Sequence, residues 1–119
     1  MILANVDIVK FPWAISNLLS NAIRVSPENG KIKVYITDRE QSAVHVKIID
    51  EGPGIQEEIQ KRMFEPYFQG EKVNSGKASG FLGLGLTIAK EVVEAHEGQI
   101  EYFNNKPRGS LFRISLPQV

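Results

Sequence analysis

Two stretches of the chain repeat their hydrophobic residues with the period of an α-helix. In the first, FPWAISNLLSNAI, the apolar positions lie three or four apart, at Phe11, Ile15, Leu18 and Ala22. This spacing predicts a helix over residues 9–25, ended by SPENG. In the second, LGLTIAKEVVEAHEG, the same spacing joins Leu84, Ile88, Val92 and Ala95. Gly98 is the expected stop of this second helix.

Other stretches alternate apolar and polar residues, which is the period of a half-buried β-strand. KIKVYIT and SAVHVKIID form one such pair, and QIEYFNN and SLFRISL, joined by KPRG, suit a hairpin. The faces expected to meet the helices carry Ile32, Val34 and Ile36 in one strand and Val44, Val46 and Ile48 in the next. We further expect a short strand at residues 2–6, a short helix at 55–63 and a mobile loop at 70–80. The pattern predicts an α+β fold with helices on one side of a mostly antiparallel sheet.

Composition narrows the function classes without choosing one. The chain has 119 residues, 42% hydrophobic and 24% charged, which suits a single globular domain. Fourteen basic and fourteen acidic side chains give a net charge of zero, so we expect no nucleic-acid partner and no anionic membrane surface. There is no cysteine, and two distant histidines do not make a metal cluster. The apolar runs are too short for a membrane span and the start lacks a signal-peptide pattern, so direct membrane insertion is not expected.

Asp50 is the first candidate functional residue. Counting alternate positions past Ile48 places Asp50 on the core-facing side of its strand, where a carboxylate is costly unless it finds a hydrogen-bond donor. The following Gly52-Pro53-Gly54 lets the backbone turn tightly and approach a ligand closely. The same three residues also suit an ordinary type II turn, and that alternative remains open at this point.

Glycines and asparagines mark two further candidates. GFLGLGL, residues 80–86, is a glycine-rich helix start that could present free N–H groups to phosphate, or could serve close packing alone. It is neither the dinucleotide fingerprint nor a Walker loop. Asn17 and Asn21 lie one turn apart although asparagine is a poor interior helix residue. They could form an exposed polar stripe, or their amide oxygens could bind Mg²⁺ beside substrate phosphates.

The order of these motifs resembles a known family. The asparagine helix, the strand followed by DEGPGI, the segment FEPYF, a polar loop and GLGL at a helix start are similar to the four boxes of the GHKL ATP-binding superfamily. Specifically, the chain resembles the catalytic and ATP-binding domain of a sensor histidine kinase, from Asp7 to the closing SLFRISLP. The resemblance implies a two-layer α/β sandwich of the Bergerat type, with a mixed, mostly antiparallel sheet and ATP between the helices and a lid at residues 70–82.

The resemblance also implies a role for each motif residue. Asn21 would be the Mg²⁺ ligand, Asn17 would support the phosphate region, and Asp50 would accept the adenine amino group. The expected nucleotide-binding positions are Asn17, Asn21, Arg24, Asp50, Gly52, Gly54, Ile55, Lys72, Lys77, Gly83, Leu84, Gly85, Leu86 and Ser110. Arg24 stands where a lysine often neutralises phosphate, and Ser110 supplies the small hydroxyl near the aspartate.

The chain departs from the family pattern in four places, one of which is a pair of adjacent residues. Val25 replaces an aromatic residue beside adenine, and Glu97 replaces a common glycine after His96. Gln69 stands where arginine often contacts the γ-phosphate, a contact that Lys72 or Lys77 could supply. Phe81 and Leu82 stand where a glycine and a small residue are usual.

The resemblance implies that this domain binds MgATP in the cytoplasm and presents its γ-phosphate to a histidine on a separate helical hairpin of a dimeric parent kinase. The parent then serves a response regulator, and the sequence leaves open whether it is anchored in a membrane. Neither His45, expected to face solvent, nor His96, near a helix end, has the context of an acceptor, so no catalytic residue is expected in this chain. One alternative is an ATP hydrolase of the gyrase type, but Asn17 stands where such enzymes carry a glutamate that activates water. Another is a partner-binding module with a degenerate nucleotide site.

Overall fold

The computed structural model describes residues 2–39, 42–65, 82–105 and 107–119, and the fold is stated for these residues. Along the chain the elements are α1 (Lys10–Val25), β1 (Lys33–Arg39), β2 (Ala43–Asp50), α2 (Glu57–Gln60), α3 (Leu82–Ala95), β3 (Gln99–Asn104) and β4 (Ser110–Pro117). The two long helices, the first two strands and the β3–β4 hairpin are therefore confirmed, with α3 beginning two residues earlier than the spacing of its apolar residues indicates. The expected helix at 55–63 is reduced to α2, and turns follow it to Phe64.

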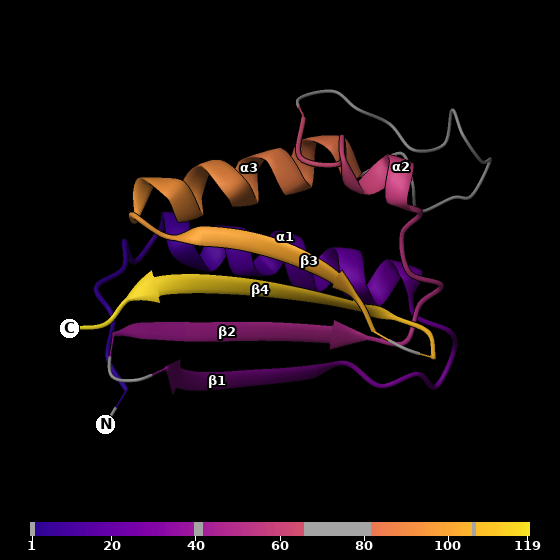
Figure 1. The fold of residues 1–119 in the computed structure, drawn as a ribbon, viewed down its shortest axis with the longest axis horizontal. Coiled ribbons are helices and arrows are strands. Elements are labelled where there is room, and N and C mark those ends of the chain that lie inside the picture. Colours follow the sequence, from indigo (N-terminus) through magenta and orange to yellow (C-terminus); the bar gives the residue numbers. More distant parts are fainter. Residues whose placement is uncertain (1, 40–41, 66–81, 106) are drawn as a thin grey trace.

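The four strands form one sheet in the order β1-β2-β4-β3, and neighbours pair antiparallel throughout the described residues (Figure 1). The register aligns side chains into rows that cross β2, β4 and β3 on one face. One row holds Val46, Ile114 and Ile100, and the next holds Ile48, Phe112 and Tyr102. The last row, at the end of the ladder, holds Asp50, Ser110 and Asn104. The core face therefore changes from apolar to polar within one step along the strands.

Helices α1 and α3 run along the strands and bury the apolar rows (Figure 1). Leu18, Ala14, Ala89 and Val93 are fully buried between the helices and the sheet, and Phe112 and Ile114 meet them from β4. The α+β architecture with helices on one face of an antiparallel sheet is thus confirmed.

A histidine ties the end of α3 to the start of α1. The Asp7 backbone N–H donates to His96 Nε2 at 2.8 Å, so the ring proton lies on Nδ1, which donates to the carbonyl of Val92 at 2.7 Å. The Asp7 carboxylate accepts the N–H groups of Val9 and Lys10, and these hydrogen bonds hold the pKa of Asp7 below its ordinary value. Because the end of α3 lies at the start of α1, the helices are antiparallel, and the start of α3 lies beside the end of α1.

Strand β1 corrects one expectation about the core. Val34 pairs with Ile48 and Ile36 with Val46, so the predicted faces do match across the two strands. However, Val34 and Ile36 are 49% and 60% exposed, because β1 is an edge strand beyond the reach of the helices.

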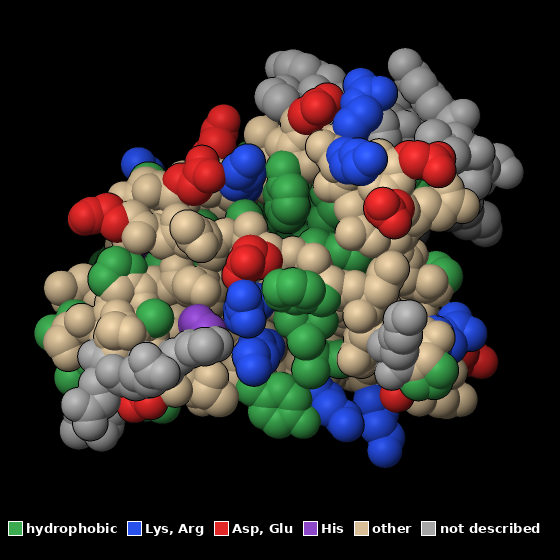
Figure 2. Space-filling view, viewed as in Figure 1, with side chains coloured by type: hydrophobic (Ala, Val, Ile, Leu, Met, Phe, Trp, Pro, Cys, Tyr) green, Lys and Arg blue, Asp and Glu red, His purple; other side chains and the backbone are tan. Residues whose placement is uncertain are grey.

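On the molecular face shown in Figure 2, a strip of hydrophobic side chains lies between interspersed acidic and basic ones, with no extended basic patch.

Two other expectations were wrong. Residues 2–6 do not form a strand, and the chain there is held instead by a hydrogen bond from the Val119 N–H to the Leu3 carbonyl. His45 was expected to face solvent but is only 8% exposed. It does lie on the sheet face away from the helices, but its strand is central, and its register partners Thr37 and Ser115 flank it on both sides. Alternation along one strand does not reveal how much neighbouring strands cover.

The end of α3 shows why a glycine is common at position 97, where this chain has a glutamate. Glu97 has a φ of 61°, and the Gly98 N–H donates to the Val93 carbonyl, which is the closing pattern of a helix whose last residue turns left-handed. The left-handed residue is therefore Glu97 rather than the expected stop, Gly98. Gly98 is needed for another reason: a Cβ there would lie 2.3 Å from the carbonyl oxygen of Ser115.

This arrangement predicts that Glu97→Gly stabilises the fold by about 0.5–1 kcal/mol, since glycine adopts positive φ without the steric cost that Glu97 bears. Urea denaturation measures the change. Gly98→Ala is the matched comparison and is expected to destabilise, because the added methyl meets the backbone of β4. A lower stability of Glu97→Gly would contradict this account of the helix end.

Candidate functional site

One end of the sandwich gathers the polar row and four chain segments at or next to predicted site residues (Figure 1). Strand β2 ends there at Asp50, the β3–β4 connection turns there, and the last turn of α1 lies there with Val25 against Gly52. The first turn of α3 lies at the same end, because the two helices are antiparallel. The opposite end holds the described parts of the chain near its two termini together with His96.

Asp50 lies on the core side of the sheet, as its position in the strand predicts, and is 1% exposed. Its Oδ1 accepts the N–H of Gly52 at 2.8 Å, and the Ser110 N–H also donates to its carboxyl group. Burial raises the pKa of Asp50 above its ordinary value, and these two hydrogen bonds oppose the rise without cancelling it. Asp50 is thus an enclosed hydrogen-bond acceptor at a strand end, with the glycine turn directly beside it.

The turn after Asp50 is held by the β3–β4 hairpin. Asn104 Oδ1 accepts the Ile55 N–H at 3.1 Å, and Arg108 Nε donates to the carbonyls of Glu51 and Gly52 at 3.1 and 3.3 Å. Gly54 has a φ of 81°, and a Cβ there would lie 2.9 Å from Asn104 Oδ1. The glycine turn is therefore more than a reversal of the chain, because side chains from another hairpin fix its backbone.

The glycine at 52 and the valine at 25 fit each other. A Cβ on Gly52 would lie 2.9 Å from both Val25 Cγ2 and the Val25 carbonyl oxygen. The departure from an aromatic residue at position 25 therefore places a compact side chain in direct contact with the loop.

Asn17 and Asn21 carry the most unusual polar atoms of the site. Asn21 is 5% exposed, and within the described residues its Oδ1 is buried with no hydrogen-bond partner, as is Asn17 Nδ2. Unpaired buried polar atoms are rare because each costs about 1–3 kcal/mol. The pair offers an unpaired oxygen acceptor and an unpaired N–H donor one helical turn apart, which fits a cation next to an anionic oxygen. Arg24 is exposed two turns after Asn17 on the same helix.

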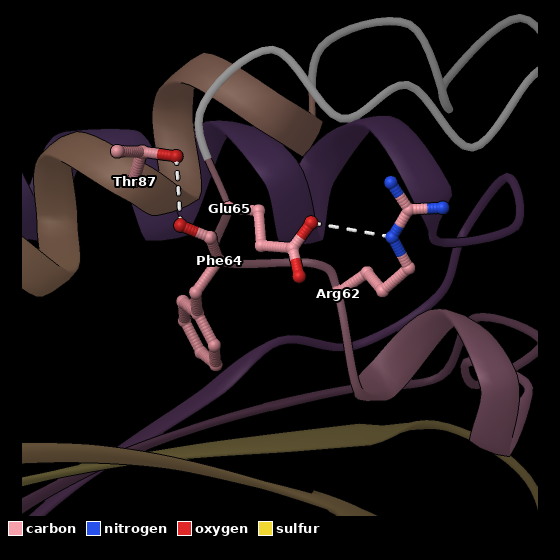
Figure 3. Close-up of polar contacts among 4 residues, drawn as sticks. All are labelled: Arg62, Phe64, Glu65 and Thr87. Carbon is pink, nitrogen blue, oxygen red and sulfur yellow. Dashed lines mark hydrogen bonds and ion pairs between the residues drawn. The ribbon is translucent and has the colours of Figure 1, made fainter.

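The start of α3 supplies backbone N–H groups. Gly83, Leu84 and Gly85 lie in its first turn, where the N–H groups have no intrahelical acceptor. Leu86 is 1% exposed and packs in the core, so the structure gives it a packing role. Thr87 Oγ1 donates to the Phe64 carbonyl at 2.9 Å, which joins α3 to the segment after α2, where Arg62 and Glu65 form an ion pair (Figure 3).

Other predicted residues cannot be placed in this site. Lys72, Lys77, Gln69, Phe81 and most of the predicted lid at 70–82 lie outside the described residues. In the parts that are described, no group of three His, Cys, Asp or Glu side chains could hold a metal ion, and no helix is long and apolar enough to cross a membrane.

Sequence reasoning missed three residues beside the site: Tyr102, Asn104 and Arg108. Tyr102 and Asn104 share the parity of Ile100, so alternation along β3 places them on the core face. Their contact with the loop after Asp50 depends on the register of β3 against β4, which alternation does not supply. Arg108 carries no signal of its own in the sequence.

Comparisons with known proteins agree with this geometry. Residues 7–119 match the family described as histidine kinase-, DNA gyrase B-, and HSP90-like ATPase. The adaptive-response sensory kinase SasA of Gloeothece citriformis is 46% identical over 103 residues, which cover 87% of this chain and 25% of that protein. The mycobacterial sensor histidine kinase MprB superposes with a TM-score of 0.82 at 30% identity, covering 98% of this chain and 78% of that one.

A third comparison involves a complex. Histidine kinase ThkA, solved with the response regulator protein TrrA, superposes with a TM-score of 0.69 at 32% identity, over 89% of this chain and 28% of that one. The chain thus spans about a quarter of the length of SasA and of this ThkA chain. By its matched family, its relatives and its fold, the chain belongs to the histidine kinase-, DNA gyrase B- and HSP90-like ATPase family, as a sensor histidine kinase catalytic and ATP-binding domain.

Proposed function

We propose that this domain binds MgATP at the end of the sandwich that holds Asp50 and Asn21, and presents the γ-phosphate to a histidine on a separate phosphoacceptor hairpin. The observation that carries the proposal is a pair of buried amide atoms, on Asn17 and Asn21, that have no hydrogen-bond partner among the described residues and lie at the same end as an enclosed carboxylate. The carboxylate can accept a hydrogen bond from a nucleobase, and the two amides can bind a metal ion and a phosphate.

In the proposed complex, Asp50 accepts the adenine amino group, and Gly52 and Gly54 leave room for the base. The hairpin contacts of Asn104 and Arg108 hold this loop in place before the nucleotide arrives, which reduces the ordering cost of binding. Ser110, 3% exposed and opposite Asp50 in the ladder, completes the edge that faces the base.

At the phosphate end, Asn21 Oδ1 is proposed as a Mg²⁺ ligand and Asn17 Nδ2 as a donor to a phosphate oxygen. An amide oxygen is a hard, neutral ligand of the kind that Mg²⁺ accepts beside substrate phosphates and water. When bound, Mg²⁺ neutralises charge that develops on the phosphate oxygens. Arg24 adds positive charge, and the N–H groups of the first turn of α3 face the same region. Lys72 and Lys77 remain proposed phosphate contacts on sequence grounds.

In the described parts of the chain, neither histidine is suited to attack the γ-phosphate. Both ring nitrogens of His96 are engaged, by the Asp7 N–H and the Val92 carbonyl, and His45 is buried in the sheet. Asn17 cannot accept a proton from water at neutral pH. The acceptor histidine is therefore proposed to lie in the remainder of a parent kinase, and catalysis here is by positioning and charge neutralisation.

The wider assembly is also proposed from relatives. The ThkA structure contains a response regulator, so a response regulator is the proposed downstream partner of the parent kinase, which we propose to be a homodimer. Because its ATP supply is cytoplasmic, the domain is proposed to work on the cytoplasmic side, whether or not the parent is anchored in a membrane.

The role of Asp50 predicts that Asp50→Asn weakens ATP binding about 10- to 100-fold, the usual value of a hydrogen bond to a charged group. Because burial raises the pKa of Asp50 above 3.8, acidification protonates it at a higher pH than an ordinary aspartate. ATP affinity of the unaltered chain is therefore expected to fall in mildly acidic solution. Calorimetry at several pH values measures this, alongside a melting curve that checks folding.

Asp38→Asn is the matched control, because Asp38 is exposed on the edge strand β1. It should keep the affinity and the pH profile of the unaltered chain. A folded Asp50→Asn variant that binds ATP as tightly as the parent would remove Asp50 from the adenine site.

If the acceptor histidine lies outside this domain, the domain alone is expected to bind MgATP but neither to label itself nor to hydrolyse ATP appreciably. Asn17 stands where a hydrolase carries its general base, a group typically worth about 10²–10⁴ in rate. Incubation with γ-labelled ATP tests this. Addition of the parent's histidine hairpin is expected to yield acid-labile phosphohistidine on the hairpin. Rapid release of labelled phosphate by the pure domain, lost in Asn21→Ala, would instead support the hydrolase alternative.

A further inference from the structure

Ser110, Tyr102 and Asn104, next to Asp50 on the sheet, are joined by a continuous line of hydrogen bonds. Ser110 Oγ lies 2.8 Å from Tyr102 Oη, and Tyr102 Oη lies 2.8 Å from Asn104 Oδ1. Asn104 Oδ1 also accepts the Ile55 N–H at 3.1 Å. Ser110 and Asn104 belong to the same cross-strand row as Asp50, and Tyr102 belongs to the row before it. The line therefore connects the loop after Asp50 to the residue opposite Asp50.

The direction of each hydrogen bond in this line is fixed by one backbone group. The Ile55 N–H can only donate, so the Asn104 atom that faces it must be the carbonyl oxygen and not the amide nitrogen. That oxygen can only accept, so the Tyr102 hydroxyl must use its one hydrogen on Asn104. Tyr102 Oη then has only lone pairs left for Ser110, so the Ser110 hydroxyl donates to Tyr102.

The surroundings keep this order in place. Burial raises the pKa of Tyr102 above its ordinary value of 10.0, so the phenol keeps the proton that it donates. Ser110 is 3% exposed, which leaves little solvent to compete for its hydroxyl hydrogen. The ring of Tyr102 packs edge-on against Phe112, with centroids 5.0 Å apart, and this contact fixes the position of its hydroxyl.

We propose that Tyr102 and Asn104 determine base specificity by making Ser110 a hydrogen-bond acceptor toward the nucleotide. With its hydrogen committed to Tyr102, the Ser110 oxygen offers only lone pairs, as does ionised Asp50. The nucleobase then meets two hydrogen-bond acceptors, Asp50 and Ser110. They favour a purine whose 6-amino group donates hydrogen bonds, and they disfavour a purine whose O6 can only accept them. Tyr102 and Asn104 act through Ser110 and are positioning residues. This inference rests on the proposed nucleotide site.

A purely structural role of Tyr102 would affect the binding of different nucleotides alike, whereas the proposed role affects the choice between nucleobases. In Tyr102→Phe the Ser110 hydroxyl can rotate and donate to O6, directly or through one water. The ratio of ATP affinity to inosine triphosphate affinity is expected to fall about three- to tenfold, the value of one neutral hydrogen bond. Calorimetric titration with each nucleotide in Mg²⁺ measures the ratio. Tyr35→Phe, the same change on the exposed edge strand, is expected to leave it unchanged.

A second pair of variants keeps the test decisive if Tyr102→Phe does not fold. Asn104→Asp retains an oxygen for both donors and is expected to keep the ratio within about twofold, whereas Asn104→Ala is expected to lower it as Tyr102→Phe does. An unchanged ratio in folded Tyr102→Phe, or equal ratios in the two Asn104 variants, would contradict the proposed role of this line of hydrogen bonds but not the ATP site itself. If the unaltered chain does not bind ATP, both the ATP site and the proposed role of the line of hydrogen bonds are wrong.

Discussion

The pairing of Asp50 with Ser110 at the end of the β2–β4 ladder is the constraint on which the site depends. It places a carboxylate on the core face one step beyond the last apolar row, where burial raises its pKa and backbone N–H groups partly compensate. It also aligns Asn104 with the same row, so that the β3–β4 hairpin can hold the loop through Ile55, Glu51 and Gly52. A slip of one residue in this register would turn the whole row to the other face of the sheet.

The helices add the second half of the site at a cost to local stability. Asn17 and Asn21 lower helix propensity, and within the part of the chain that the structure describes each has a buried amide atom without a hydrogen-bond partner. Both effects lower the stability of the fold. Such conflicts between local preference and the fold are expected where function selects a residue. At the far end, both ring nitrogens of His96 are hydrogen-bonded and its ring packs against Phe11. These contacts join the end of α3 to the start of α1. Rigid packing at one end thereby places Asn21 beside the start of α3 at the other.

Much of this could be predicted from the sequence, and the remainder has identifiable physical causes. The helical period predicted α1 and α3, alternation predicted the four strands, and strand parity placed Asp50 on the core face. Alternation failed where a property depends on neighbours: Ile36 is exposed because β1 is an edge strand, and His45 is buried because β2 is central. The positive φ at Glu97 was hidden because the adjacent glycine offered a simpler helix stop. The line from Ser110 to Asn104 needed the register of β3 and β4, which only tertiary structure supplies.

The proposed function requires that Asn21 Oδ1 and Asp50 belong to one MgATP site. It is tested most directly by titrating a non-hydrolysable ATP analogue into the unaltered chain and into Asn21→Ala, each with and without Mg²⁺, with Ser20→Ala on the exposed side of the same helix as control. Mg²⁺ is expected to strengthen binding to the unaltered chain and to Ser20→Ala but not to Asn21→Ala. Asn21→Ala is also expected to melt no lower than the parent, since alanine is the better helix former by about 0.5–0.7 kcal/mol. An equal effect of Mg²⁺ on Asn21→Ala and the unaltered chain would contradict the account.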